Sequence, residues 1–472
     1  MKKITYLLIA MVFLTTSCKK EWFEVTKSST LAPKEAFKGT KDARNAINGI
    51  FSRLQSENAY GADYLTYGDV KGDDVQTSLE GKRTLSMYIM QETAEANTGT
   101  FWSRPYGNIM GVNYLLSMKD EILTTSDADL EYKNYILANA YALRALSHFD
   151  LVRIYGKMPH NGNPSTDLGV PVVTTSLETT AKVARNTVAE VYTQVYSDLD
   201  AALALYPSGY SNTVDGWFNL EAINALYARV ALYKEDWSKA YTKAKAVIST
   251  NKYSLVSTAD DYKAMWSDPK CKGEAILTII NTAEDNPSRE GIGNLWSPSG
   301  YGAVVLTNSF IADATAVVSD IRSSIFEKNT TIKRDNGYLL KYPGLDGTTG
   351  VMTNNIHIIR YSEVILIAAE AAANGAGSDA LTLLNLLQTK RGGTLSATAT
   401  TADILAERRL ELVGEGHRFF DLMRTGTTMT RTGTGHLTGV PMSILANDKR
   451  AIQPIPRYEL DVNPNIVQNT GY

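Results

Sequence analysis

A helix–turn–helix unit that occurs twice is the strongest constraint on the fold of this chain. Residues 219–250 contain two stretches of helical periodicity with a short break between them, and residues 361–391 do so again. In the first unit Ala228 and Ala240 are 12 residues apart, one on each helix, and the second unit repeats this offset from Ala368. Small side chains at a crossing let two helices approach closely, as in tetratricopeptide repeats. The spacing predicts tetratricopeptide-like hairpins; two unrelated hairpins with chance alanines are the alternative.

Three further helices and an irregular region accompany these units. Periodic apolar residues predict helices over residues 41–56, 128–155 and 187–205, the last with Thr187 as its N-cap. A long Gly- and Pro-rich loop joins the second and third of these helices, and insertions of that kind are often functional. Residues 251–358 are rich in Gly, Pro, Asn, Ser and Thr, which predicts loops with a few short strands or single-turn helices.

The pattern as a whole sets the fold class. Pro456 and the Asn-Pro-Asn run at 463–465 predict an extended C-terminal tail rather than a helix. The fold expected is therefore mainly α, with tetratricopeptide-like helical hairpins that form an α-superhelix. An irregular loop-rich region and few short strands complete it.

The N-terminus has the order of a secretory signal. Lys2 and Lys3 precede an apolar run at 4–14, and small residues lead from there to Cys18. The run is too short to span a bilayer as a helix. A cysteine placed there resembles a bacterial lipoprotein box, although Thr15 stands where that box usually has Leu. An ordinary signal peptide with an incidental cysteine is the alternative.

If Cys18 is lipidated, residues 1–17 are removed as a lipoprotein signal peptide, and residues 18–34 form a lipid-anchored tether. No other segment has 18 consecutive apolar residues, so we expect the lipid to be the protein's only membrane attachment. Acyl chains on this residue would hold the protein on the membrane through their buried methylene groups.

Composition and motifs argue against several classes of function. The chain has 47 Lys and Arg against 50 Asp and Glu and no basic stretch, so we expect no nucleic-acid partner. Two cysteines exclude a disulfide framework, and the five histidines lack the spacing of a zinc site. Nucleophile-elbow and phosphate-loop motifs are absent. We therefore name no catalytic residue, no metal ligand and no cofactor.

Two charged clusters invite a chemical interpretation. Residues 407–418 alternate Glu and Arg on an expected helix, which favours internal ion pairs over acid–base catalysis. Asp69, Asp73 and Asp74 flank a glycine in an expected loop, where carboxylates can hold calcium. The 12-residue calcium-loop pattern is absent, so a capping or solvated role is favoured.

Aromatic residues on polar segments are the most useful signal for a binding site. The chain has 26 Tyr and 11 Phe, and several rings fall in segments that we expect to be loops. Flat rings on such loops can stack on sugar faces or peptide side chains. The candidate ligand-binding residues are Asn294, Trp296 and Tyr301, the pair Tyr64 and Tyr67, and Trp102 near Tyr106. The alternative is that each ring fills the helical core, which is the interpretation favoured for Trp217 and Trp237.

Four stretches resemble the SusD/RagB family of outer-membrane nutrient-binding lipoproteins of Bacteroidota. The first three begin Ala138-Asn-Ala-Tyr, Ile359-Arg-Tyr-Ser-Glu and Glu407-Arg-Arg-Leu-Glu, and the fourth is the tail with Ile455-Pro456 and Asn463-Pro-Asn465. They resemble, in order, that family's first long helix, its later repeat helix, its near-terminal signature and its C-terminal tail. With the lipoprotein-like start, the similarity spans nearly the whole chain.

The resemblance implies a lipid-anchored protein on the outer membrane, facing the exterior. Such a protein pairs with a SusC-like TonB-dependent barrel and captures oligosaccharide, or in some members peptide, for import. It implies no catalysis. The family's ligand residues lie in variable loops, so the aromatic candidates above rest on the residues alone.

Two other classes of function stay open. A surface glycan hydrolase would need two carboxylates placed across a bound sugar, and a repeat scaffold would bind only protein. On the binding-protein interpretation the chain divides into three parts after the tether. These are a helical repeat region (35–250), a loop-rich ligand-binding region (251–358), and a C-terminal repeat pair with the signature helix and tail (359–472).

Overall fold

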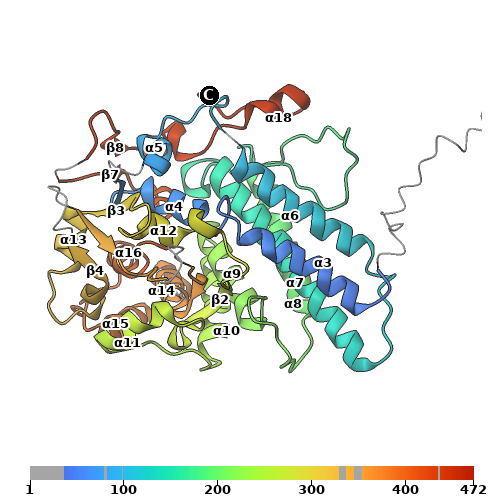
Figure 1. The fold of residues 1–472 in the computed structure, drawn as a ribbon, viewed down its shortest axis with the longest axis horizontal. Helices are drawn as coiled ribbons and strands as arrows, with labels where there is room; N and C mark the ends of the chain where they lie inside the picture. The colour runs from blue at the N-terminus through green and yellow to red at the C-terminus, as the bar shows by residue number, and fades with distance from the viewer. Residues whose placement is uncertain (1–36, 79–81, 98, 329–335, 345–352, 434–435) are drawn as a thin grey trace, which may run out of the picture.

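A row of packed helices forms one side of the molecule. A computed structural model of the chain describes residues 37–78, 82–97, 99–328, 336–344, 353–433 and 436–472, so Cys18, the predicted signal peptide and the tether lie outside the described part. Helices α3 (Thr40–Leu54), α6 (Thr100–Ser117), α7 (Asp127–Tyr155) and α8 (Val188–Leu205) lie side by side (Figure 1). The helices predicted over 41–56, 128–155 and 187–205 are confirmed, and Thr187 caps α8 in a reciprocal capping box.

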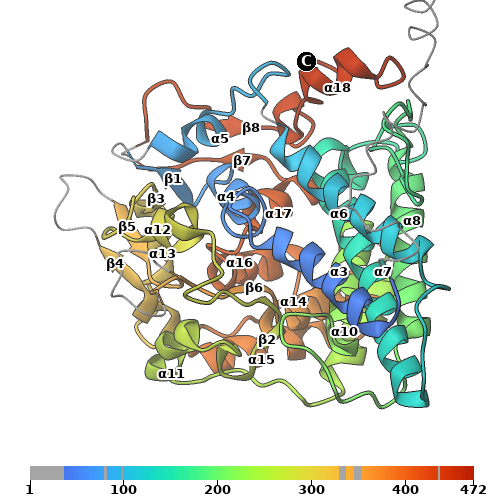
Figure 2. The same ribbon diagram turned by 45° about the vertical axis from the view of Figure 1, so that its right-hand side comes forward.

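The two predicted hairpins pack on each other although more than 100 residues separate them in the chain. The first consists of α9 (Leu220–Tyr233) and α10 (Trp237–Ile248), the second of α14 (Tyr361–Ala371) and α15 (Ala380–Arg391). α8 packs on α9, and α10 packs on α14, so the row of helices continues from one hairpin into the next (Figure 2). The mainly helical fold with few short strands is thus confirmed.

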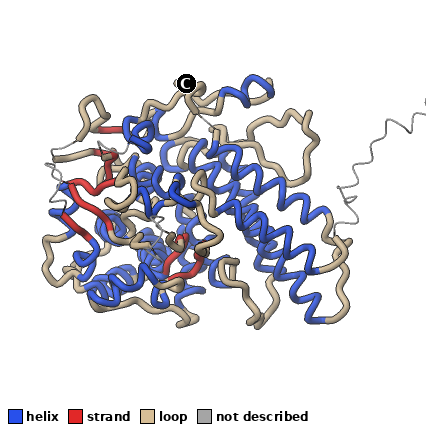
Figure 3. Tube along the Cα trace, in the orientation of Figure 1, coloured by secondary structure: helices blue, strands red, loops and turns tan. Residues whose placement is uncertain are grey.

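Short strands and helices cover the other side of the molecule (Figure 3). β1 (Val75–Thr77), β3 (Val304–Thr307), β5 (Asn336–Leu339) and β4 (Phe326–Lys328) form an antiparallel sheet in that order, with Val75 opposite Leu306. β2 (Ala275–Ile279) pairs with β6 (Ile356–Arg360), and β7 (Met429–Thr430) with β8 (Ser443–Ile444). The short helices are α4 (Asp63–Val70), α5 (Leu85–Ile89), α11 (Ala259–Ala264), α12 (Ile292–Trp296), α13 (Asn308–Ala314), α16 (Thr401–Glu411), α17 (Arg418–Arg424) and α18 (Arg457–Val462).

Two expectations about the C-terminal part are wrong. The tail is not extended throughout, because α18 follows directly after Pro456, whose fixed φ suits the start of a helix. The charged stretch 407–418 is not one helix, because α16 ends at Glu411 and α17 begins at Arg418. Gly416, in the turn between them, has φ of 78°, and a Cβ there would lie 2.7 Å from the Leu65 backbone. Only glycine fits that position without strain.

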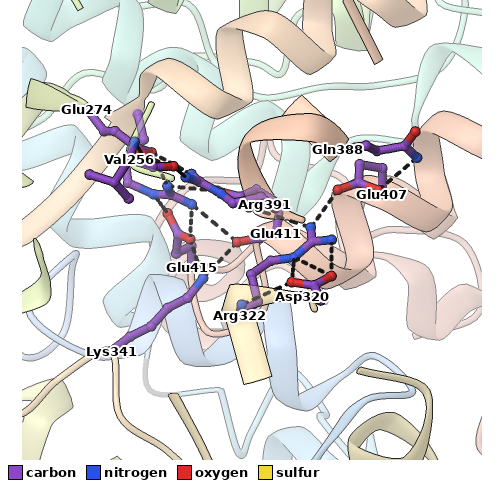
Figure 4. Close-up of polar contacts among 11 residues, drawn as sticks. Val256, Glu274, Asp320, Arg322, Lys341, Gln388, Arg391, Glu407, Glu411 and Glu415 are labelled. Carbon is purple, nitrogen blue, oxygen red and sulfur yellow. Dashed lines mark hydrogen bonds and ion pairs between the residues drawn. The ribbon is translucent and has the colours of Figure 1, made fainter. Parts of the chain in front are cut away.

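The turn brings carboxylates together with cations from distant elements, as Figure 4 shows. Arg360, at the end of β6, contacts Glu411 at 3.0 Å and Glu415 at 2.7 Å. Arg391, at the end of α15, contacts the same Glu411 at 2.9 Å. The cluster also contains Glu274, Asp320, Arg322, Lys341 and Glu407, all of them buried. The expected ion pairs are therefore present, but they join elements far apart in the chain rather than neighbours on one helix.

The cations decide the ionisation of the buried carboxyl groups. Burial by itself disfavours the charged form of Glu415, but Arg360 and Lys341 outweigh it and lower the pKa of Glu415 to about 2. The pKa of Glu411 falls well below its usual value because Arg391 and Arg360 likewise outweigh its burial. The cluster is therefore charged at neutral pH and acts as one unit of mutually paired groups.

Removing one member of this cluster should destabilise the fold strongly. Glu411→Ala removes a buried carboxylate that three arginines contact, and it leaves Arg360 and Arg391 with Glu274 as their shared partner. We expect a loss of about 3 to 5 kcal/mol in the free energy of unfolding. Arg457→Ala is the matched control, since its i,i+4 pair with Asp461 is more than half exposed and should contribute under about 1 kcal/mol. Urea unfolding of both variants checks this, and equal losses would contradict a structural role for the cluster.

Candidate functional site

Most of the aromatic candidates are not on exposed loops, which corrects the premise on which they were chosen. Tyr64 and Tyr67 lie on α4, and both rings are buried against Phe101. Trp296 ends helix α12 and is 1% exposed, so it packs in the core. A ring covered in this way offers no face to a ligand in this conformation. Ligand contact by these three residues remains an untested prediction.

Tyr301 lies at the surface, but neighbouring residues already contact both its hydroxyl group and its ring. The backbone N–H of Tyr301 donates to the carbonyl of the buried Asn294 at 2.7 Å, and its hydroxyl donates to Glu290 at 2.9 Å. The Arg83 guanidinium lies 3.7 Å from the centre of the half-buried Tyr301 ring and pairs with Glu290. One face of the ring is therefore occupied by a cation. A ligand that stacks there has to displace Arg83.

Trp102 has a different environment, because it lines a cavity. The cavity has a volume of about 640 Å³ and is called the α6 cavity here. Trp102 and Tyr106 on α6 form one wall, residues 171–183 of the long loop form a second, and Glu459 and Asn463 at α18 form the third. Trp102 does not lie in a loop, as the sequence suggested, but in the third position of a helix that continues through Pro105. Trp102 is 3% exposed, so its ring is nearly covered, and the partly exposed Tyr106 beside it supplies more of the cavity surface.

The loop wall of the α6 cavity is held in place by side chains from two helices. The Tyr106 hydroxyl donates to the Pro171 carbonyl at 2.8 Å. Asn113 donates to the Val173 carbonyl at 3.1 Å, and the Val173 N–H donates to Nε2 of His148 at 3.2 Å. Because helix side chains fix the backbone at residues 171 and 173, this part of the wall is formed before any ligand arrives.

Polar groups face the apolar walls of the α6 cavity. Burial is the main cause that raises the pKa of the Glu459 carboxyl, and a hydrogen bond from the Trp102 side chain opposes it. Lys182 donates to the Val462 carbonyl at the rim of the same cavity. Around this hollow, the half-buried carboxylate can accept hydrogen bonds from hydroxyl groups of a ligand, and the cation can donate to them. An aromatic ring can pack on the carbon atoms of the same ligand.

Comparisons with known proteins agree with the fold. The model described as SusD family matches residues 318–472, and one described as starch-binding associating with outer membrane matches residues 21–232. A SusD superfamily protein from Bacteroides vulgatus, solved by crystallography, is 31% identical with a TM-score of 0.86, covering 92% of this chain and 100% of that one. The chain belongs to the SusD/RagB family.

Relatives at lower identity also match over nearly the whole length of the chain. SusD-like protein P38 of Formosa agariphila is 25% identical over 99% of this chain and 98% of its own length. A laminarin binding SusD-like protein shares the fold, with a TM-score of 0.75 at 23% identity over 92% of this chain and 100% of that one. SusD family proteins are non-catalytic. Among the residues described for this member, none of the helices combines the length and apolar character that crossing a membrane requires.

Sequence reasoning missed the residues of this SusD family protein that complete the α6 cavity. Glu459 and Asn463 lie in the tail that was expected to be extended, more than 350 residues after Trp102. In the sequence, the one indication of this cavity was the long loop after α7, whose length is typical of functional insertions and which does line the cavity.

The three aspartates considered as calcium ligands have other partners. Asp69 accepts from the Gly416 N–H, and Asp73 and Asp74 pair with Arg418.

The His148 imidazole should stay neutral in the folded protein well below pH 6.5. Burial lowers its pKa to about 3, and the nearby Arg144 charge adds to this effect. The unfolded chain therefore takes up the proton first, and stability is lost as the pH falls from about 6.5 toward 3.

The measurement is the free energy of unfolding in urea between pH 6.5 and 4. His148→Gln, which keeps a side-chain acceptor for Val173, should reduce the slope of stability against pH by up to about 1.4 kcal/mol per pH unit. Identical slopes for parent and variant would show that His148 carries no such shift.

Proposed function

We propose that this protein binds an oligosaccharide in the α6 cavity and delivers it to a SusC-like TonB-dependent transporter in the outer membrane. The observation that carries the binding site is the meeting of Trp102, Tyr106 and Glu459 around one preformed hollow in a SusD family chain. The family description as starch-binding and the laminarin-binding protein of the same fold support a glycan as the ligand class.

The chemistry of the α6 cavity suits a sugar. Sugar rings have apolar C–H faces that pack on the exposed part of an aromatic ring, which the partly exposed Tyr106 offers here, with the buried Trp102 beside it. Their hydroxyl groups donate to carboxylates and accept from cations, and Glu459 and Lys182 supply one of each. Because the loop wall is already fastened, little ordering is needed on binding.

Hydrolysis is less well supported than binding at this site. A glycoside hydrolase places two carboxyl groups on either side of the scissile bond. Of the described residues that line the α6 cavity, Glu459 alone has a carboxyl group. A binding role needs only one such acceptor, and the non-catalytic character of the family agrees with it.

Glu459→Gln should weaken glycan binding without unfolding the protein. Loss of a charge-assisted hydrogen bond should lower affinity by at least about tenfold. Asp461→Asn is the matched control, because it lies on the same helix α18, is exposed, and does not line the cavity. A glycan array identifies the bound polysaccharide, and calorimetry with its oligosaccharides measures affinity.

Three outcomes decide between the functions. Weaker binding by Glu459→Gln alone supports the cavity as the site. Equal affinity for the parent, Glu459→Gln and Asp461→Asn would place the ligand elsewhere on the molecule. An array on which the parent binds no glycan would overturn the glycan function itself.

Export and lipid attachment complete the proposed function. Residues 1–17 would be the signal peptide, and Cys18 would bear the lipid at the start of a tether that ends at residue 34. The anchor would hold the binding protein beside the barrel at the cell exterior. In this arrangement the helical repeats (35–250), the loop-rich region (251–358) and the C-terminal part (359–472) form the soluble body on the tether.

Cys18→Ala should release the protein from the outer membrane. The reason is that the acyl chains on this cysteine would be its lipid attachment. Fractionation after a salt wash, in cells with and without the proposed SusC-like barrel, measures the effect. Retention of the variant in the membrane fraction of cells that lack the barrel would contradict lipid anchoring.

A further inference from the structure

A second hollow with an aromatic wall lies across α3 from the α6 cavity. It has a volume of about 500 Å³ and is called the α3 groove here. Asn48, Phe51 and Ser52 on α3 line one side, and Asp215 and Trp217 line the other. A neighbouring hollow of about 310 Å³ shares residues 214–217 and continues the groove toward Tyr253. None of the candidate site residues chosen from the sequence lies in either hollow.

The aromatic wall of the groove is a rigid stack. Trp217 is packed between Tyr135 beneath it, at 5.5 Å between ring centres, and Phe51, at 5.6 Å and nearly parallel. Trp217 is almost fully buried, whereas Phe51 is only partly buried. Phe51 is therefore the outer ring, and the tryptophan supports it from behind. A partly exposed ring that packs on a buried tryptophan is a suitable platform for an apolar sugar face.

The opposite side of the groove is also held in a fixed conformation. Gly216 adopts φ of 86°, which favours glycine, and so lets residues 214–217 turn back tightly. The Val214 N–H donates to the Tyr135 hydroxyl at 3.2 Å, and the Phe218 N–H donates to Asn139 at 2.8 Å. Two side chains of α7 thus fasten the turn, and the groove needs no ordering to accept a ligand.

Exposed polar groups border the Phe51 platform. Asn48 is exposed, and its Oδ1 accepts from the Trp217 indole N–H at 3.1 Å, which points the amide toward the groove. Asp215 and Asp285 are exposed carboxylates that also line it. Amide and carboxylate groups around one ring are the partners that hydroxyl groups of a sugar need.

The groove and the α6 cavity are neighbours. α3 and α6 pack along each other (Figures 1 and 2). Ser52 lines the groove, and the next residue, Arg53, donates from its guanidinium to the carbonyl of Gly107 at 2.5 Å. Gly107 in turn lines the α6 cavity. The two hollows therefore border the same α3–α6 contact, and this is the basis for the inference that one extended ligand engages both.

We propose that the α3 groove is a second carbohydrate subsite, with Phe51 as its stacking platform and Asn48 as its polar contact, which engages the same glycan chain as the α6 cavity. The inference rests on the glycan function proposed above but on a separate set of residues. A long chain that fills both hollows gains affinity over a short one, because its second contact is intramolecular.

The test compares a short and a long oligosaccharide of the polysaccharide that binds best on the glycan array. Calorimetry on the full chain should show tighter binding of the long one. Phe51→Ala and Asn48→Ala should lower the affinity for the long oligosaccharide to that for the short one. The expected loss for Phe51→Ala, which removes the platform ring, is about thirtyfold. Asn45→Ala is the matched control, an exposed asparagine of the same helix that does not line the groove.

Each outcome decides the matter. Because Phe51 also packs on the core, Asn48→Ala carries the test if Phe51→Ala fails to fold. Groove variants that bind both ligands like the parent, while Glu459→Gln weakens both, overturn the groove and leave the cavity. Groove variants that weaken binding while Glu459→Gln has no effect support the groove and overturn the cavity. A parent that binds no glycan overturns both.

Discussion

Glu411 is fully buried and stays ionised only because arginines from three different parts of the chain converge on it. A lone carboxylate in that position would be too costly, so the contacts from Arg322, Arg360 and Arg391 have to form together. The consequence is geometric. The contacts hold the end of α16, the end of β6 and the end of α15 against one another.

The helical row on the other side depends on apolar packing and supplies rigid positions for loops. α7 is the central element, since its side chains reach both of the hollows described. His148 fastens the loop wall of the α6 cavity, and Tyr135 and Asn139 fasten the turn of the α3 groove. Loop residues that line the two hollows are thus held by side chains of a helix, which explains how a repeat fold with long insertions can present preformed surfaces.

The two hollows share a design that fits the proposed role in glycan capture. Each has one partly exposed aromatic wall on a helix and one loop wall with polar or charged groups. Neither needs a catalytic group, because a delivery protein must release what it binds unchanged. A surface that touches a chain at two neighbouring places can hold a polysaccharide firmly through contacts that are individually modest.

Local patterns in the sequence determined the helices, because periodicity and capping act within a few residues: α7, α8 and both hairpins follow from them. The resemblance in four stretches gave the family. The sequence did not show which aromatic rings are buried. Trp296 and Tyr67 are covered by residues far away in the chain, and the polar residues next to them in the sequence do not reveal this. The partners of Glu411 and the meeting of Trp102 with Glu459 were likewise decided only by the tertiary structure, because such contacts depend on where distant helix ends come to lie.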